Sequence, residues 1–182
     1  MFEKKRFRLI IGLLIVILFA VAIFASYGVD YMQSKKALNN FLKLIEQEKT
    51  DDIRLTIYYA KPGIFTPMPL SVDMLINSYK EDVIYISSLK EHIDLLRQIN
   101  TGVLIPVENE YYLNARLCYV FETEKDGKIL EVVMDNPYAS IVFVNGLKVQ
   151  GNDILTDVIR PFLTEDAAKE LYMLPEKTTN SN

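Results

Sequence analysis

An uncharged apolar run near the N-terminus constrains this chain more than any other feature. Twenty-one residues without a charge lie between Arg8 and Asp30, and Leu, Ile, Val and Phe are dense among them. A helix of about 20 such residues spans the ~30 Å hydrocarbon core of a bilayer. Four basic residues directly precede the run, and basic residues that flank a span stay on the cytoplasmic side. We therefore expect residues 1–8 in the cytoplasm, a transmembrane helix over residues 9–28, and the remaining chain outside.

The alternative is a signal peptide that is cleaved on export, after which the protein would be secreted. Ala20, Val21 and Ala22 form a small-x-small cleavage site. Against cleavage, apolar residues continue past this site, and no Gly/Ser/Pro-rich linker separates the run from the helical pattern that follows. A lipoprotein anchor is excluded, because it requires a cysteine at the cleavage point and the single cysteine is Cys118. We therefore favour a single-pass protein of the cell membrane.

The other 154 residues have the composition of one globular domain. They are 46% apolar and carry a net charge of −7, which suits a chain long enough to bury its own core. The negative charge disfavours binding to nucleic acid. One cysteine cannot form an intramolecular disulfide, so stability must come from the core.

Hydrophobic periodicity predicts an α+β domain. Helical spacing predicts a juxtamembrane amphipathic helix over residues 29–50, which continues from residues 9–28 without a strong break. Within a domain over residues 51–175, period-two alternation predicts strands at 53–60, 82–87, 111–123, 128–134, 140–144 and 147–150. Helices are predicted at 71–79, 88–100, 154–160 and 165–174, before a polar tail at 176–182. The fold class is thus one N-terminal transmembrane helix followed by a largely antiparallel sheet with helices packed on it.

Local signals mark where these elements begin and end. Asn145-Gly146 is a strong two-residue hairpin signal, and Asp126-Gly127 marks another turn. The sequence Ser-Leu-Lys-Glu at 88–91 is a capping box, and Gly102 suits the left-handed residue that follows a helix. Helix N-caps are predicted at Ser71, Asp153 and Thr164. The last four strands are therefore expected to form an antiparallel meander.

Several segments resemble those of exported, N-terminally anchored domains of low-GC Gram-positive bacteria. The segments are EHIDLLRQIN, IPV, ARLCYVFETE, VNG and PFLTEDAAKEL, spread over residues 91–171. The resemblance implies a bacterial cell-surface setting. It transfers no functional residue, because this class has no assigned chemistry.

The sequence contains no strong catalytic motif. His92 is the single histidine, so a Ser or Cys triad would have to use it, and Cys118 lies in the middle of a predicted strand. Glu122, Glu124 and Asp126 could together hold a hard cation, although no calcium-loop motif accompanies them. We therefore expect no metal and no cofactor.

The apolar loop over residues 63–70 is the candidate for partner binding. Ile64, Phe65, Met68 and Leu70 are costly to leave in water, while Pro67 and Pro69 keep the segment out of a central strand. The alternative is that the loop folds back over the end of the core. The sequence thus favours a non-enzymatic extracytoplasmic interaction module with a protein or cell-wall partner; the rival is an exported hydrolase with an acidic or Cys-His site.

Overall fold

One antiparallel sheet forms the centre of the domain. A computed structural model describes residues 2–61, 66–78, 83–86, 89–108 and 110–172; the described side chains of its first helix are those of residues 14–17 and 28–46. Within these residues, six strands pair in the order β2-β1-β3-β4-β5-β6. They are β1 (Ile53–Tyr59), β2 (Val83–Ile86), β3 (Leu117–Thr123), β4 (Gly127–Met134), β5 (Ile141–Val144) and β6 (Leu147–Gln150). The α+β class and the antiparallel meander of β3 to β6 are confirmed.

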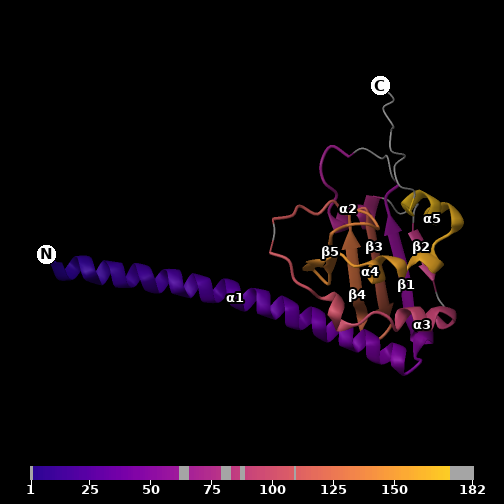
Figure 1. Ribbon diagram of the computed structural model, residues 1–182, viewed down its shortest axis with the longest axis horizontal. Helices are drawn as coiled ribbons and strands as arrows, with labels where there is room; N and C mark the ends of the chain where they lie inside the picture. The colour runs from indigo at the N-terminus through magenta and orange to yellow at the C-terminus, as the bar shows by residue number, and fades with distance from the viewer. Residues whose placement is uncertain (1, 62–65, 79–82, 87–88, 109, 173–182) are drawn as a thin grey trace.

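A single helix, α1 (Phe2–Glu46), makes up the N-terminal quarter of the chain. Figure 1 shows that its C-terminal part lies against the domain, while its N-terminal part projects away from it. The expected amphipathic helix therefore continues directly from the apolar run, and it ends at Glu46 rather than at residue 50. Among the residues that the structure describes, no helix is both long and apolar enough to cross a membrane.

The C-terminal part of α1 belongs to the main core. Ser34, Leu38, Phe41 and Ile45, spaced by four and three residues, form its buried stripe. The Ser34 hydroxyl donates a hydrogen bond of 3.1 Å to the carbonyl of Val144 on β5. This stripe packs on one face of the sheet, so the helix is a structural part of the domain rather than a linker to it.

Side chains on both faces of the sheet are buried, so helices pack on both sides of it. The main core joins α1 to α3 (Ile93–Leu96), α4 (Asp153–Asp157) and α5 (Glu165–Tyr172). A second cluster lies on the opposite face, where α2 (Val72–Ser78) contributes Leu75 and covers Cys118, Val120 and Val133. The sheet has apolar side chains at alternating positions on both faces, so each face needs a cover.

The helix predicted over residues 88–100 is shorter than expected. The chain instead forms η3 (Lys90–His92), α3, and then η4 (Thr101–Val103). Leu89 caps η3 without a side-chain hydrogen bond, and Ser88 of the predicted capping box lies outside the described residues. Gly102 does not close a helix, because it lies within η4 and its N–H donates to the Asn100 side chain at 2.8 Å.

The strand predicted over residues 111–123 begins only at Leu117. The residues before it are held by contacts other than a ladder: the Tyr111 hydroxyl donates to the Asp135 carboxylate, and the Ala115 N–H donates to the Leu70 carbonyl at 2.8 Å. Hydrogen bonds to residues distant in the sequence therefore occupy hydrogen-bonding groups that a longer strand would have used in its ladder.

Two of the predicted helix caps are confirmed and one is wrong. Ser71 accepts a hydrogen bond from the Met74 N–H, and Thr164 accepts one from the Ala167 N–H. The cap of α4 is Asn152 rather than Asp153, because the Ile154 N–H donates to the Asn152 side chain at 2.8 Å. Asn and Asp are both good N-cap residues, so the local sequence alone did not decide between Asn152 and Asp153.

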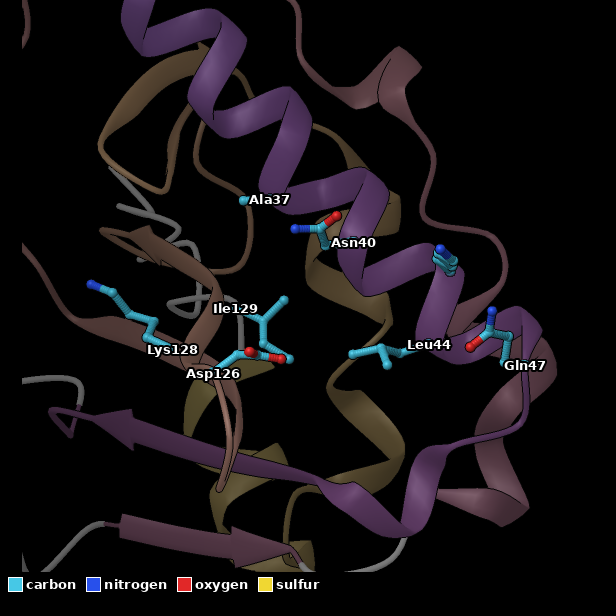
Figure 2. Close-up of a pocket in the computed structure, with 8 residues that line it drawn as sticks. Ala37, Asn40, Leu44, Gln47, Asp126, Lys128 and Ile129 are labelled. Atoms are coloured by element: carbon cyan, nitrogen blue, oxygen red, sulfur yellow. The ribbon is translucent and has the colours of Figure 1, made fainter.

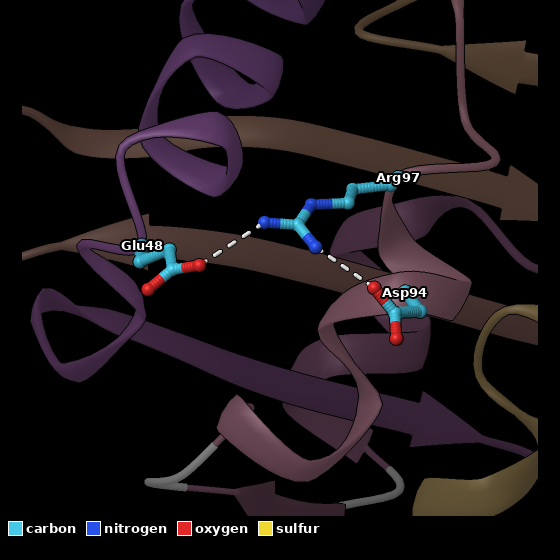
Figure 3. Close-up of polar contacts among 3 residues, drawn as sticks. All are labelled: Glu48, Asp94 and Arg97. Atoms are coloured by element: carbon cyan, nitrogen blue, oxygen red, sulfur yellow. Dashed lines mark hydrogen bonds and ion pairs between the residues drawn. The ribbon is translucent and has the colours of Figure 1, made fainter.

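An exposed ion-pair bridge lies at the end of α1. Arg97 contacts Asp94 at 2.8 Å and Glu48 at 3.3 Å, which ties the turn after α1 to α3 (Figure 3). Glu48 adopts a left-handed backbone with φ of 55°. The chain reverses here into η1 (Thr50–Asp52) and then enters β1.

Candidate functional site

A groove runs between α1 and the β3–β4 hairpin, and we call it the α1 groove. Its central cavity has a volume of about 480 Å³. Figure 2 shows Asn40, Leu44 and Gln47 on the helical wall, with Asp126 and Lys128 on the hairpin opposite. The hairpin turn is fixed by Gly127, whose φ of 67° is readily adopted by glycine.

Two further cavities extend the α1 groove along the helix. One, of about 460 Å³, shares Ala37, Lys128 and Ile129 with the central cavity and reaches Gln33. The other, of about 550 Å³, shares Leu44 with it and reaches Lys49. The three cavities share lining residues and lie along the C-terminal part of α1.

The floor of the α1 groove is apolar, whereas its walls carry charges of both signs. Ala37 and Leu44 are half-buried and Ile129 is buried, so these three form the floor. Lys128 pairs with Glu131 at 2.9 Å on the hairpin side. The groove can therefore hold a ligand that has both apolar and polar groups.

The wall formed by the β5–β6 turn is held firmly in place. Asn145 and Gly146 adopt φ of 49° and 83°, as the predicted two-residue turn requires. The Asn145 side chain accepts a hydrogen bond from the Glu131 N–H at 2.7 Å and donates one to the Ile129 carbonyl at 3.3 Å. This turn is thus bonded directly to β4, so the groove has a preformed wall.

The loop predicted to bind a partner does not form one apolar surface in its described part. Leu70 is 2% exposed and packs in the second-face cluster, and its N–H donates to the Asn114 side chain at 3.0 Å. Met68 is 66% exposed. Ile64 and Phe65 lie outside the described residues. The burial of Leu70 is what we expect if the loop folds back over the core. The exposed side chain of Met68 is accessible to a partner.

Cys118 and His92 do not form a catalytic pair. Cys118 is buried in the second-face cluster, and burial raises the pKa of its thiol to about 12. His92 makes an edge-on ring contact at 4.8 Å with Phe162, which belongs to the main core on the other face. The sheet therefore separates the two groups, and a thiol with so high a pKa is a poor nucleophile.

Of the acidic residues singled out from the sequence, Glu124 and Asp126 line the same cavity beside α1. Glu124 forms an ion pair with Arg54, and Asp126 lies at the α1 groove. Among the residues that the structure describes, no group of three or more His, Cys, Asp or Glu side chains is placed to hold a metal ion. The hairpin carboxylates thus contribute charge to the groove.

Sequence reasoning missed the groove because its residues look like ordinary solvent-exposed helix positions. The signal was present as a second stripe on α1, at residues 33, 37, 40 and 44, which runs beside the buried stripe and is continued by Gln47 just past the end of the helix. Nothing in the sequence indicated that a hairpin 80 residues later would lie opposite this stripe. No protein-family model, curated protein or solved structure matches the chain.

Proposed function

We propose that this chain is a membrane-anchored binding module that carries its domain outside the cytoplasm and holds a partner in the α1 groove. The observation that carries the proposal is that one helix contains both the apolar run and a wall of the groove. The N-terminal part of α1 bears the apolar run, and its C-terminal part is at once a core element and a wall of the groove. A bound partner would therefore be held close to the membrane surface.

The anchor is supported by the apolar run and by the side chains described within it. Leu14, Ile15, Val16 and Ile17 are each between 48% and 64% exposed. Four successive residues cover a full turn of a helix, so this part of α1 is apolar on all sides. A helix that is apolar all round needs an apolar environment, such as a membrane. The basic residues before it favour a cytoplasmic N-terminus.

Binding rather than hydrolysis is supported by the placement of the reactive groups. The thiol of Cys118 is buried on one face of the sheet, and His92 contacts the core of the other face. The α1 groove, by contrast, is open to solvent and lined by hydrogen-bonding groups from two elements. These features suit recognition of a partner without a chemical step.

Thiol labelling on intact cells tests the anchor and its orientation. Glu3→Cys and Asp153→Cys each add one thiol probe, and native Cys118 is buried and so adds little background labelling. We expect a membrane-impermeant maleimide to label the probe at 153 on intact cells and the probe at 3 only after permeabilisation. The reverse pattern would overturn the orientation. A mature N-terminus at Ile23 would replace the anchor by a cleaved signal peptide.

Site-specific photo-crosslinking tests the binding role of the groove. A photoreactive residue placed at Asn40 lies in the groove, whereas one at the neighbouring Asn39 is exposed on the helix but does not line it. In living cells we expect an adduct from position 40 and none from position 39. If neither position gives an adduct, or both do so equally, the groove is not a binding site.

A further inference from the structure

The C-terminal part of α1 crosses the strands of the sheet nearly at right angles (Figure 1). Ser34 bonds to Val144 on β5, and Phe41 contacts Phe121 on β3. These two strands are two positions apart in the sheet, which is about 10 Å, and the helix rises about 10.5 Å between Ser34 and Phe41. Each further strand position toward β6 therefore corresponds to about three residues toward the N-terminus of α1.

An extended segment, residues 105–107, continues the sheet beyond the edge strand β6. The Gln150 N–H donates a hydrogen bond of 2.8 Å to the Ile105 carbonyl. Pro106 forms an antiparallel bridge with Val149 on β6. The backbone of this segment is thus bonded to the sheet in the place that a further strand would take.

This edge segment lies level with the end of the apolar run. It is two strand positions, about 10 Å, from β5, so it meets α1 at the level of six or seven residues before Ser34. That level is residues 27–28, the last residues of the predicted span over 9–28. Tyr31, one residue after the first charge that follows the run, already packs against the main core. No linker therefore separates the apolar run from the domain.

The exposed side chains on this side of the domain suit a membrane–water interface. Figure 1 shows the connection from η4 to β3 on the side toward which the N-terminal part of α1 projects. Within it, Ile105 is 53% exposed and Tyr112 is 86% exposed. Tyrosine is enriched at membrane interfaces, because its ring is apolar and its hydroxyl is polar. Glu108 and Glu110 are exposed between them, so a zwitterionic lipid surface fits better than an anionic one.

We propose that Ile105 and Tyr112 form a second membrane contact, with their side chains at the boundary between the hydrocarbon core and the headgroups. This inference rests on the proposed function, because it requires the apolar run of α1 to span the bilayer. The helix holds the domain against the surface, since α1 is continuous from the run to the core. Contact at two points would fix the rotation of the domain about the axis of α1.

Quenching of tryptophan fluorescence by brominated lipid tests the proposal. The chain contains no tryptophan, so Ile105→Trp and Tyr112→Trp each introduce a single fluorophore at an exposed position. The full chain is reconstituted in phosphatidylcholine liposomes, with and without lipid that is brominated near the top of its acyl chains. We expect the brominated lipid to lower the emission of both variants at least twofold, because bromine quenches only rings that lie close to it.

Gln98→Trp is the matched control. Gln98 is exposed and follows Arg97, which pairs with Glu48 just beyond the end of α1. The last residue of α1, Glu46, lies about 27 Å along the helix axis from residue 28. The brominated lipid should therefore leave the emission of Gln98→Trp unchanged, and its emission maximum should lie at a longer wavelength than those of the two edge variants.

The outcomes separate the second contact from the anchor. Suppose that the liposomes retain the wild-type chain in alkaline carbonate: if neither Ile105→Trp nor Tyr112→Trp is then quenched, or if Gln98→Trp is quenched equally, the second contact is overturned and the anchor stands. If alkaline carbonate extracts the wild-type chain from the liposomes, the anchor of the proposed function is overturned, and the second contact with it.

Discussion

Replacing Phe41 tests whether α1 is a structural part of the domain. The Phe41 side chain has no exposed surface, and its ring lies 4.7 Å from that of Phe121 on β3. Truncating a buried phenylalanine to alanine costs about 3–5 kcal/mol, and a whole domain is stable by about 5–15 kcal/mol. Phe41→Ala should therefore remove a large part of the free energy of unfolding.

Urea denaturation measures this loss on a chain that begins at Val29, which we expect to be soluble and to fold without a cofactor. With a urea m-value of about 2 kcal/mol/M, a loss of about 4 kcal/mol lowers the midpoint by about 2 M. Tyrosine fluorescence and circular dichroism can follow unfolding, because the chain has 11 Tyr and no Trp.

Asn40→Ala serves as the control, because Asn40 is the exposed neighbour of Phe41 on the same helix. Exposed substitutions change stability by about 0.5 kcal/mol or less, so its midpoint should move by no more than about 0.3 M. A midpoint shift below about 0.5 M for Phe41→Ala, with an unchanged m-value, would show that α1 does not belong to the cooperative core. The groove would then lose the fixed wall on which its proposed role depends.

Three other perturbations give distinct results in the same urea assay. Leu70→Ala should lower the free energy of unfolding by about 2–5 kcal/mol, because Leu70 is buried; Met68→Ala should change it by less than about 0.5 kcal/mol, and equal effects would contradict their placement. Stability should fall as pH rises from 9.0 toward 12, because burial raises the pKa of the Cys118 thiol over that range and the unfolded thiol ionises first. At pH 10.5 this amounts to about 2 kcal/mol, and Cys118→Ala should show a correspondingly weaker pH dependence; identical profiles would refute it. Arg97→Ala should cost less than about 1 kcal/mol despite its two ion pairs, since the partners are exposed, and a larger loss would mean that the corner after α1 is a stability centre.

Short-range chemistry explains the elements that sequence patterns predicted well. The Asn145-Gly146 turn forms because both residues tolerate a left-handed backbone, and their φ of 49° and 83° follow from residue type alone. Thr164 caps α5 because its hydroxyl reaches an N–H three residues later. The alternation along β1 likewise placed Ile53, Leu55 and Ile57 in the main core.

Long-range contacts decided the features that sequence patterns missed. Residues 111–116 alternate like a strand, yet Tyr111 and Asn114 bond to Asp135, and Ala115 bonds to Leu70. Such partners are distant in the sequence, so a local pattern carries no information about them. The same reason explains why Leu70 is buried while Met68, two residues earlier, is exposed.

The amino-acid sequence by itself determined the apolar run, the identity of most strands and turns, and the buried stripe of α1, because each depends on residues within a few positions of one another. Only the tertiary structure decided the strand order, the cover on the second face, and the pairing of α1 with the β3–β4 hairpin. The α1 groove belongs to this second group. The stripe of α1 residues that lines it is local to one helix, but the stripe becomes a wall of a groove only because the β3–β4 hairpin packs beside it, and that placement depends on how the whole core closes.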